Sequence, residues 1–224
     1  MNLGGGADQG YNGTLTISNG LFQADTLNAP QDSRYEYDYT INVRGETGKL
    51  ELSSNLNVCS PTRDFRTKGS STLNVEGGEV AVGGTIAFGS SADKRKNYFN
   101  LSGVTAKVTA AAMSCATNAV NTNTEPETGF ANTLVETAGN IAFSSNAAIK
   151  TPITIDATAC KSGAWQTLFK SSGGEIKNYS NAQITVSGTY KNRESQLRVV
   201  TDEEEKVTAV QFRVKGGGLV LILK

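Results

Sequence analysis

Apolar and polar residues alternate along much of this chain, and short turns rich in glycine and asparagine separate the alternating stretches. The clearest stretch covers residues 34–44, with apolar positions at Tyr35, Tyr37, Tyr39, Ile41 and Val43. A period of two places successive side chains on opposite faces of an extended chain, so it predicts a β-strand with one wet face. No segment of comparable length carries a helical repeat. The pattern therefore predicts an all-β protein.

Turn signals between these stretches predict antiparallel pairing. Asn19 and Gly20 lie at the centre of residues 14–24, and this dipeptide suits the positive φ angles of a two-residue hairpin turn. In this hairpin, Ile17 would lie opposite Phe22, and Leu15 would lie opposite Ala24. A second hairpin is predicted from residues 196–200 and 207–215, closed by the charged turn 201–206. A helical turn is predicted only at 164–170, around Trp165.

The remaining extended segments define the organisation of the chain. They lie at 49–58, 71–76, 79–82, 85–88, 98–101, 104–110, 133–136, 140–143, 151–157 and 183–190. We predict an antiparallel β-sandwich or barrel with extended terminal arms. A division of the chain into two β halves stays open as an alternative. The expected parts are an N-terminal arm (1–13), a β-rich half (14–115), a polar loop or linker (116–132), a β-rich half (133–215) and a C-terminal arm or final strand (216–224). Residues 86–91 resemble 141–146, which suggests an internal duplication.

An apolar segment follows three glycines near the end of the sequence. Its residues are Leu219, Val220, Leu221, Ile222 and Leu223. Left as an exposed strand, such a segment would aggregate, so we expect it to be buried. Two arrangements fit: a final strand inside the protein's own sheet, or an arm that completes the sheet of a neighbouring subunit. The glycine-rich start, with Leu3, favours the second arrangement and predicts assembly contacts at both ends.

Charge and hydropathy exclude several partners. The 224 residues include 21 Lys and Arg and 21 Asp and Glu, so the net charge is zero. Such a chain has no bulk attraction for nucleic acid or an anionic membrane. Lys94, Arg95 and Lys96 precede Tyr98 and Phe99, but we expect these cations to cap a loop and do not expect nucleic acid as a partner. No apolar run is long enough to predict a membrane span.

Histidine is absent from the sequence, which removes the commonest general base and the usual zinc ligand. Glu36, Asp38 and Glu51 could in principle act as glycosidase carboxylates, but their positions on a wet strand face indicate solvated surface acids. We therefore predict no enzyme activity, no cofactor and no metal site. Tyr35, Tyr37 and Tyr39 are interpreted as core or inter-subunit packing and are the candidate interface aromatics.

Three cysteines, Cys59, Cys115 and Cys160, lie far apart in the sequence. The N-terminus lacks the basic start and apolar core of a secretory signal, so we expect buried reduced thiols and leave one internal disulfide as the alternative.

These observations favour a structural, self-assembling protein whose partners are copies of itself and other structural subunits. We expect a virion component, such as a head decoration, tail or minor capsid subunit. The alternative is a cell-surface fibre, an adhesion module or a carbohydrate-binding module that has lost a signal peptide. The glycosylation sequons at Asn12, Asn100 and Asn178 would have meaning only in that extracellular setting.

Overall fold

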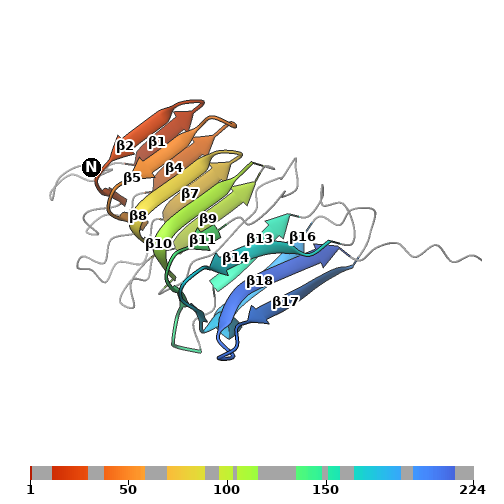
Figure 1. The fold of residues 1–224 in the computed structure, drawn as a ribbon. Coiled ribbons are helices and arrows are strands. Elements are labelled where there is room, and N and C mark those ends of the chain that lie inside the picture. The colour runs from red at the N-terminus through yellow and green to blue at the C-terminus, as the bar shows by residue number, and fades with distance from the viewer. Residues whose placement is uncertain are drawn as a thin grey trace, which may run out of the picture.

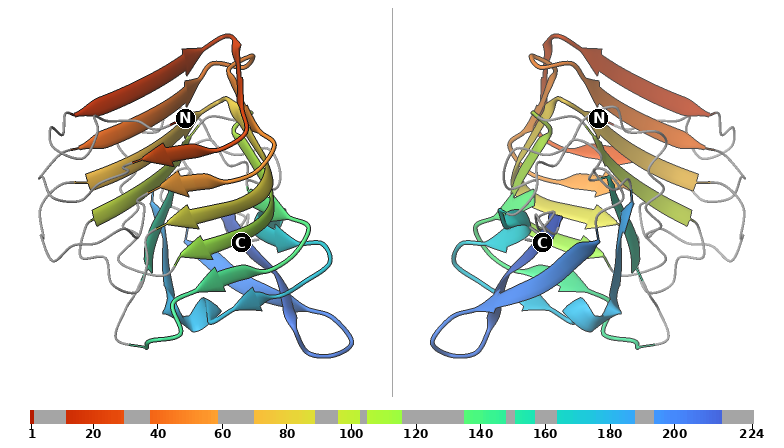
Figure 2. Two further views of the ribbon diagram at one scale, coloured as in Figure 1. Left: turned by 90° about the vertical axis from the view of Figure 1, so that its left-hand side faces the viewer. Right: turned by 90° about the vertical axis from the view of Figure 1, so that its right-hand side faces the viewer.

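The chain winds into a parallel β-solenoid, in which consecutive strands lie on three faces in turn and each coil stacks on the one before (Figure 1). The structure is a computed structural model that describes residues 1, 12–29, 38–58, 70–88, 96–102, 105–115, 135–147, 151–156, 164–187 and 194–214. Figure 2 shows from two sides how the coils stack, with β1 and β2 at one end and a hairpin at the other.

The first face is a four-stranded parallel sheet. It holds β1 (Gly13–Ser18), β4 (Tyr39–Arg44), β7 (Ser70–Glu76) and β9 (Lys96–Ser102). A separate parallel pair, β13 (Thr151–Asp156) and β16 (Ala182–Ser187), follows it, and β13 contacts β9. The 3-10 turn η1 (Tyr179–Asn181) leads into β16.

The second and third faces share their longest strands. The second face holds β2 (Leu21–Ala24), β5 (Lys49–Leu52), the first halves of β8 (Glu79–Phe88) and β10 (Lys107–Cys115), β11 (Val135–Thr137) and β14 (Gln166–Ser171). The third face holds β3 (Leu27–Ala29), β6 (Leu56–Val58), the second halves of β8 and β10, β12 (Ile141–Phe143) and β15 (Ile176–Lys177). Leu21, Lys49 and Glu79 stand in one ladder, so a coil takes about 30 residues, a period typical of repeat folds.

The prediction of an all-β chain is confirmed, but the prediction of antiparallel pairing is wrong for the coils. Neither a sandwich nor a barrel is confirmed. The predicted hairpin at Asn19 and Gly20 is also wrong, because Ile17 stands beside Val43 and Phe22 beside Leu50. Strands β1 and β2 belong to different faces, and each pairs with the next coil.

Left-handed residues make the corner between the first and second faces. Asn19 has φ 51°, and the residues at the same corner of the next two coils, Gly45 and Gly77, both have φ 74°. The backbone N–H of Asn19 donates to Arg44 O at 3.2 Å, which ties this corner to the coil below. Glycine and asparagine tolerate this conformation best. The Asn19–Gly20 pair, which is typical of a hairpin turn, therefore forms the bend between the first and second faces.

Glycine is also required at the corner between the second and third faces, for a different reason. A Cβ on Gly83 would lie 2.4 Å from Ser53 O, and one on Gly84 would lie 2.6 Å from Ser54 O. Adjacent coils therefore approach each other backbone to backbone at this corner, which a larger residue would prevent.

The core fills the inside of the solenoid with stacked apolar columns. In β7 and in the start of β8, buried and partly exposed residues alternate as the sequence pattern predicted. Fully buried side chains include Leu27, Ile41, Leu50, Leu56, Leu73, Ile86, Phe88 and Ile141. Phe88 of the third face stacks on Phe99 of the first, with ring centroids 5.0 Å apart, so the faces enclose one common core.

The two similar fragments occupy equivalent positions in the stack. Ile86 and Ile141 stand on either side of Met113 in the ladder of the third face. Their resemblance therefore reflects the position that each fragment takes in a coil. Strand β10 pairs with β8 of the preceding coil and with β11 and β12 of the following coil.

An antiparallel hairpin of β17 (Ser195–Thr201) and β18 (Val207–Val214) adds to the second face through β14. The hairpin prediction is confirmed, whereas the predicted helical turn at 164–170 is wrong. Trp165, Leu168 and Phe169 have helix-like spacing, but a register shift in β14 between Thr167 and Phe169 lets Leu168 and Phe169 both enter the core.

The predicted terminal arms fall mostly outside the described residues. Met1 is described, and it lies against the solenoid: Asn28 N donates to Met1 O at 3.0 Å, and Met1 N donates to Thr26 O at 2.5 Å. The predicted linker at 116–132 and the predicted arm at 216–224 lie outside the described residues.

Candidate functional site

The sheet formed by β14, β18 and β17 has two chemically different faces, because alternate residues of a strand point in opposite directions. On one face, Phe212 and Val210 of β18 are buried. On the other face, Gln211 and Arg213 of β18 lie beside Arg198 and Gln196 of β17 in the ladder. Strand β17 is the last strand of this sheet, and within the described residues β18 is its one ladder partner.

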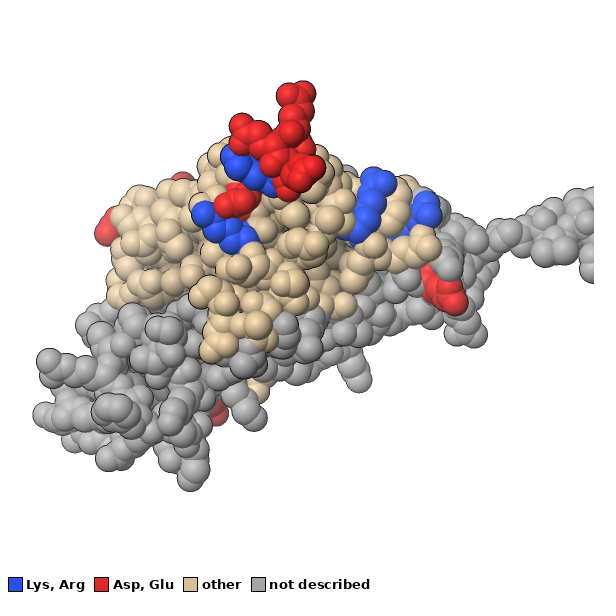
Figure 3. All heavy atoms as spheres, turned by 90° about the horizontal axis from the view of Figure 1, so that it is seen from below, with Lys and Arg blue, Asp and Glu red and all other residues tan. Residues whose placement is uncertain are grey.

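Charge on this part of the surface is divided into separate groups. The turn between β17 and β18 carries Asp202, Glu203, Glu204 and Glu205, all exposed. Figure 3 shows a tight acidic group with some basic side chains directly beside it and others farther away on the same side of the molecule. Asp202 Oδ1 accepts the backbone N–H groups of Glu204 and Lys206 at 2.9 and 3.0 Å, so this carboxylate builds the turn.

Apolar residues of β17 extend beyond the core and line a groove at the edge of the sheet. Leu197 and Val199 are 44% and 37% exposed, although the adjacent Val210 is buried. We call this hollow of about 450 Å³ the edge groove, and its apolar lining consists of Tyr179, Ala182, Ile184, Leu197, Val199 and Val210. Three of the five large apolar side chains that are exposed among the described residues lie here. The edge groove is therefore the main exposed apolar feature of the described surface.

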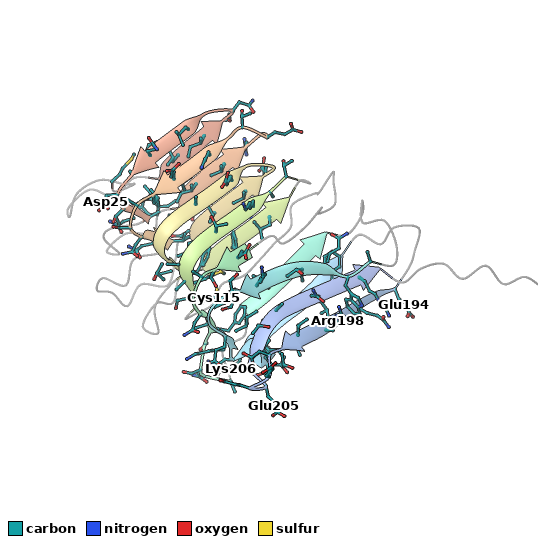
Figure 4. All side chains as sticks on the ribbon, in the orientation of Figure 1. Asp25, Cys115, Glu194, Arg198, Glu205 and Lys206 are labelled. Atoms are coloured by element: carbon teal, nitrogen blue, oxygen red, sulfur yellow. The ribbon has the colours of Figure 1, made fainter. Side chains whose placement is uncertain are left out.

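The opposite face of the same sheet carries an ordered set of cations and amides around the one tryptophan of the sequence. The guanidinium carbons of Arg198 and Arg213 lie 4.1 and 4.6 Å from the centre of the Trp165 ring, which is a cation–π arrangement. Arg198 Nε donates to Gln211 Oε1, and Arg213 Nε donates to Gln196 Oε1, both at 2.8 Å. We call this set the arginine–tryptophan face, and Figure 4 shows Arg198 well away from Glu205 and Lys206 at the turn.

A polar hollow of about 740 Å³ lies beside the turn, lined by Lys170, Ser172, Glu175, Lys206 and other polar residues. Its charges are already paired. Lys170 Nζ and Ser172 Oγ donate to Glu136 Oε1 at 2.8 and 2.7 Å, and these bonds lower the pKa of the Glu136 carboxyl below its usual value. Glu175 and Lys206 of the same lining also have described ion-pair partners, in Lys177 and Glu204.

Nine residues are predicted to make assembly contacts or to be interface aromatics, and the structure describes one of them. Tyr39 is 3% exposed and belongs to the core of β4. The other eight lie outside the described residues: Leu3, Tyr35, Tyr37, Leu219, Val220, Leu221, Ile222 and Leu223. Their role in assembly stays a prediction.

The acids considered for glycosidase chemistry do not form a described pair. Asp38 Oδ1 accepts hydrogen bonds from Ser70 N and Ser70 Oγ, both at 2.8 Å, so it joins two coils. Glu51 pairs with Lys49 at 3.4 Å, and Glu36 lies outside the described residues. Within the described ranges no group of three or more acidic, cysteine or histidine side chains is arranged to hold a metal.

Cys115 is a buried free thiol in the third face. Burial raises its pKa to about 12, because the thiolate would lose its hydration, and the thiol therefore stays protonated and unreactive at neutral pH. Cys59 and Cys160 lie outside the described residues.

The three sequon asparagines are all used inside the structure. Asn12 Oδ1 accepts from Asp38 N at 2.9 Å. A glycan would be attached to the amide nitrogen of the other two asparagines. Asn100 Nδ2 donates to Asn74 Oδ1, and Asn178 Nδ2 donates to Phe143 O. Glycosylation at Asn100 or Asn178 would place a sugar on an amide nitrogen that already makes one of these contacts. No helix in the described part of the chain has the length and apolar character needed to cross a membrane.

Sequence reasoning missed both surfaces of the terminal sheet. It predicted the hairpin, and the alternation of residues 196–199 was available as a signal for two faces. It placed Trp165 in a helical turn, however, and so could not bring the indole over the arginines of β17 and β18. Comparisons of the chain with models of protein families, with characterised proteins and with solved structures gave no match.

Proposed function

We propose that this protein is a structural, self-assembling subunit of a virion, such as a head decoration, tail or minor capsid protein, and that strand exchange joins it to its neighbours. The observation that carries the proposal is the edge groove beside the last strand of the terminal sheet. An edge strand offers unpaired backbone N–H and C=O groups, and the groove adds a place for apolar side chains.

The proposed occupant of the edge groove is the segment 219–223 of a neighbouring copy. Five apolar residues in extended form span about 17 Å, which is shorter than the seven-residue strand β17. Alternate residues of the segment, Leu219, Leu221 and Leu223, would face the groove, while the backbone pairs with the free edge of β17. This arrangement buries the segment that the sequence marks as an aggregation hazard.

We assign the segment to a neighbouring copy because of where β18 ends. Val214 stands opposite Ser195, at the end of the hairpin away from its turn. Only Lys215 and three glycines separate it from Leu219, and the five Cα–Cα steps from Val214 to Leu219 reach at most about 18 Å. The segment of the same chain would have to cross the end of β17 and reverse within that length. The segment of a neighbour can enter the groove without a reversal.

The experiment is a complementation of two association-deficient variants, followed by light scattering and analytical ultracentrifugation. One variant lacks residues 216–224 and keeps the edge groove. The other, Val199→Asp, keeps the segment and places a charge in the groove. We expect the wild-type chain to associate, each variant to be a folded monomer by circular dichroism, and their mixture to form one-to-one heterodimers.

The control is Leu21→Asp, which changes an apolar side chain that is 57% exposed at the other end of the solenoid. It should leave association unchanged. A wild-type chain that stays monomeric, or variants that do not complement each other, would overturn the strand-exchange proposal.

A cell-surface fibre, adhesion module or carbohydrate-binding module is the second candidate function, and the exposed arginine–tryptophan face favours it. Antibodies against the chain should label purified virus particles if the first proposal is right, and cell envelopes if the second is right. Mass spectrometry of the unreduced protein adds an independent result: three free thiols favour the virion, and a disulfide favours the cell surface.

A further inference from the structure

We propose that the arginine–tryptophan face binds an anionic polysaccharide through the guanidinium groups of Arg198 and Arg213. This inference does not require the assembly role, because the cations and amides of this face alternate along β17 and β18 with the apolar residues of the edge groove, although Arg198 also borders that groove. Its residues are Trp165, Thr167, Gln196, Arg198, Gln211 and Arg213.

The two cations of this face have no described counter-charge. No described carboxylate forms an ion pair with Arg198 or Arg213, although Lys49, Lys170, Lys177 and Lys206 each have one. Arg198 is exposed and Arg213 is half-buried. Two guanidinium groups that have no ion-pair partner among the described residues and lie against one indole repel each other, and an anion placed beside both would offset that repulsion.

Both guanidinium groups are held in fixed orientations before any ligand arrives. Each stacks on Trp165, and each uses its Nε–H to bind a glutamine on the neighbouring strand. No described residue accepts a hydrogen bond from their Nη atoms, so the outer edge of each planar fork remains available. Such a fork matches the two oxygens of a carboxylate or sulfate group, and its fixed geometry reduces the entropy lost on binding.

The surrounding groups suit the hydroxyl groups of a sugar. Gln211 Nε2 donates to Thr167 Oγ1 at 2.9 Å, which orients both side chains. The oxygen of Gln196 accepts the bond from Arg213, and its amide nitrogen has no described acceptor. The face therefore presents amide and hydroxyl groups next to two cations on one side of the sheet, where an extended polymer can lie.

A polysaccharide fits this face better than a nucleic acid does. Binding of single strands depends on bases that stack on free aromatic rings, and the indole of Trp165 is already covered by guanidinium groups.

The test uses the fluorescence of Trp165, the one tryptophan of the chain, during titration of the full-length protein with dextran sulfate. We expect saturable binding that weakens as salt is added, and no binding of uncharged dextran. The double substitution Arg198→Gln and Arg213→Gln should weaken binding at least tenfold, measured by isothermal titration calorimetry as well, since it also changes the environment of the indole.

The matched control is Lys170→Gln with Lys206→Gln, which removes the same charge from the same end of the molecule outside the face. It should change the affinity less than twofold. Equal losses in the two double variants would show an unspecific charge effect and overturn the proposal. Failure of the wild-type chain to bind dextran sulfate, or tighter binding of oligo-dT in the same assay, would also overturn it.

Discussion

At the scale of single residues, a ladder of asparagines joins the coils of the first face. Asn42 Nδ2 donates to Thr16 Oγ1 at 3.1 Å, Asn74 Nδ2 to Asn42 Oδ1 at 2.7 Å, and Asn100 Nδ2 to Asn74 Oδ1 at 2.7 Å. Asn42 and Asn74 each use both the nitrogen and the oxygen of the amide, as in the ladders of stacked parallel strands, whereas Asn100 at the end of the ladder uses its nitrogen. These polar side chains therefore fix the register of the coils that the apolar core fills.

We predict that Asn74→Ala lowers the free energy of unfolding by about 2–4 kcal/mol, because it removes two hydrogen bonds and leaves Asn42 and Asn100 each with an unpaired polar atom. The matched control is Asn57→Ala, which removes a single described side-chain bond, to Asn28 at 2.7 Å, and should cost about 1 kcal/mol. Urea unfolding of both variants checks this. Equal costs would show that the ladder of three asparagines is no more important than an isolated pair.

At the scale of elements, the terminal hairpin combines a well-paired ladder with a strained turn. Asp202 N donates to Lys206 O at 3.0 Å, and Glu205 has φ 61°. A non-glycine residue in this region costs of order 1 kcal/mol or more, since its Cβ crowds the carbonyl oxygen. The turn is held by Asp202 in spite of this cost.

Replacing Glu205 with glycine should therefore raise the free energy of unfolding by about 0.5–1 kcal/mol, since the strain is relieved and part of the gain is lost to the greater entropy of the unfolded glycine. Glu204→Gly, one residue earlier with no positive φ, should lower it by a similar amount. Thermal unfolding followed by circular dichroism measures both. A destabilised Glu205→Gly variant would contradict the strain argument.

At the scale of the whole molecule, each coil contacts mainly the coils beside it. Strands β8 and β10 have ladder partners on both sides, whereas β1, β2 and β3 have described ladder partners only in the following coil. Stability in such a stack is close to a sum of nearest-neighbour terms, so the ends open more readily than the middle.

Hydrogen exchange measured by mass spectrometry should therefore show the amides of β1, β2 and β3 exchanging faster than those of β8 and β10. The peptides of β17 and β18 should be protected further when the wild-type chain is associated, and the variant lacking 216–224 serves as the comparison. Uniform protection along the stack would mean that the solenoid opens as one cooperative unit and would refute the nearest-neighbour picture.

The local pattern determined which residues are extended and which side chains are buried. Tyr39, Ile41 and Val43 are buried as their period of two predicted, and the hairpin closed by residues 201–206 forms as its turn residues indicate. These features depend on neighbours along the chain, through backbone pleating and turn geometry, so the sequence is enough to predict them.

The choice of partner strands was decided only by the tertiary structure. Asn19 has a backbone conformation that suits both a hairpin turn and a solenoid corner. The corner forms here, and Ile17 and Phe22 stand beside Val43 and Leu50 of the next coil. Likewise, Trp165 directly precedes β14 and does not belong to a helical turn, and the pairing of β14 with β18 places its ring beside Arg198 and Arg213. Such pairings join residues about 30 positions apart or more, and their stability comes from burial shared between coils, which no local pattern contains.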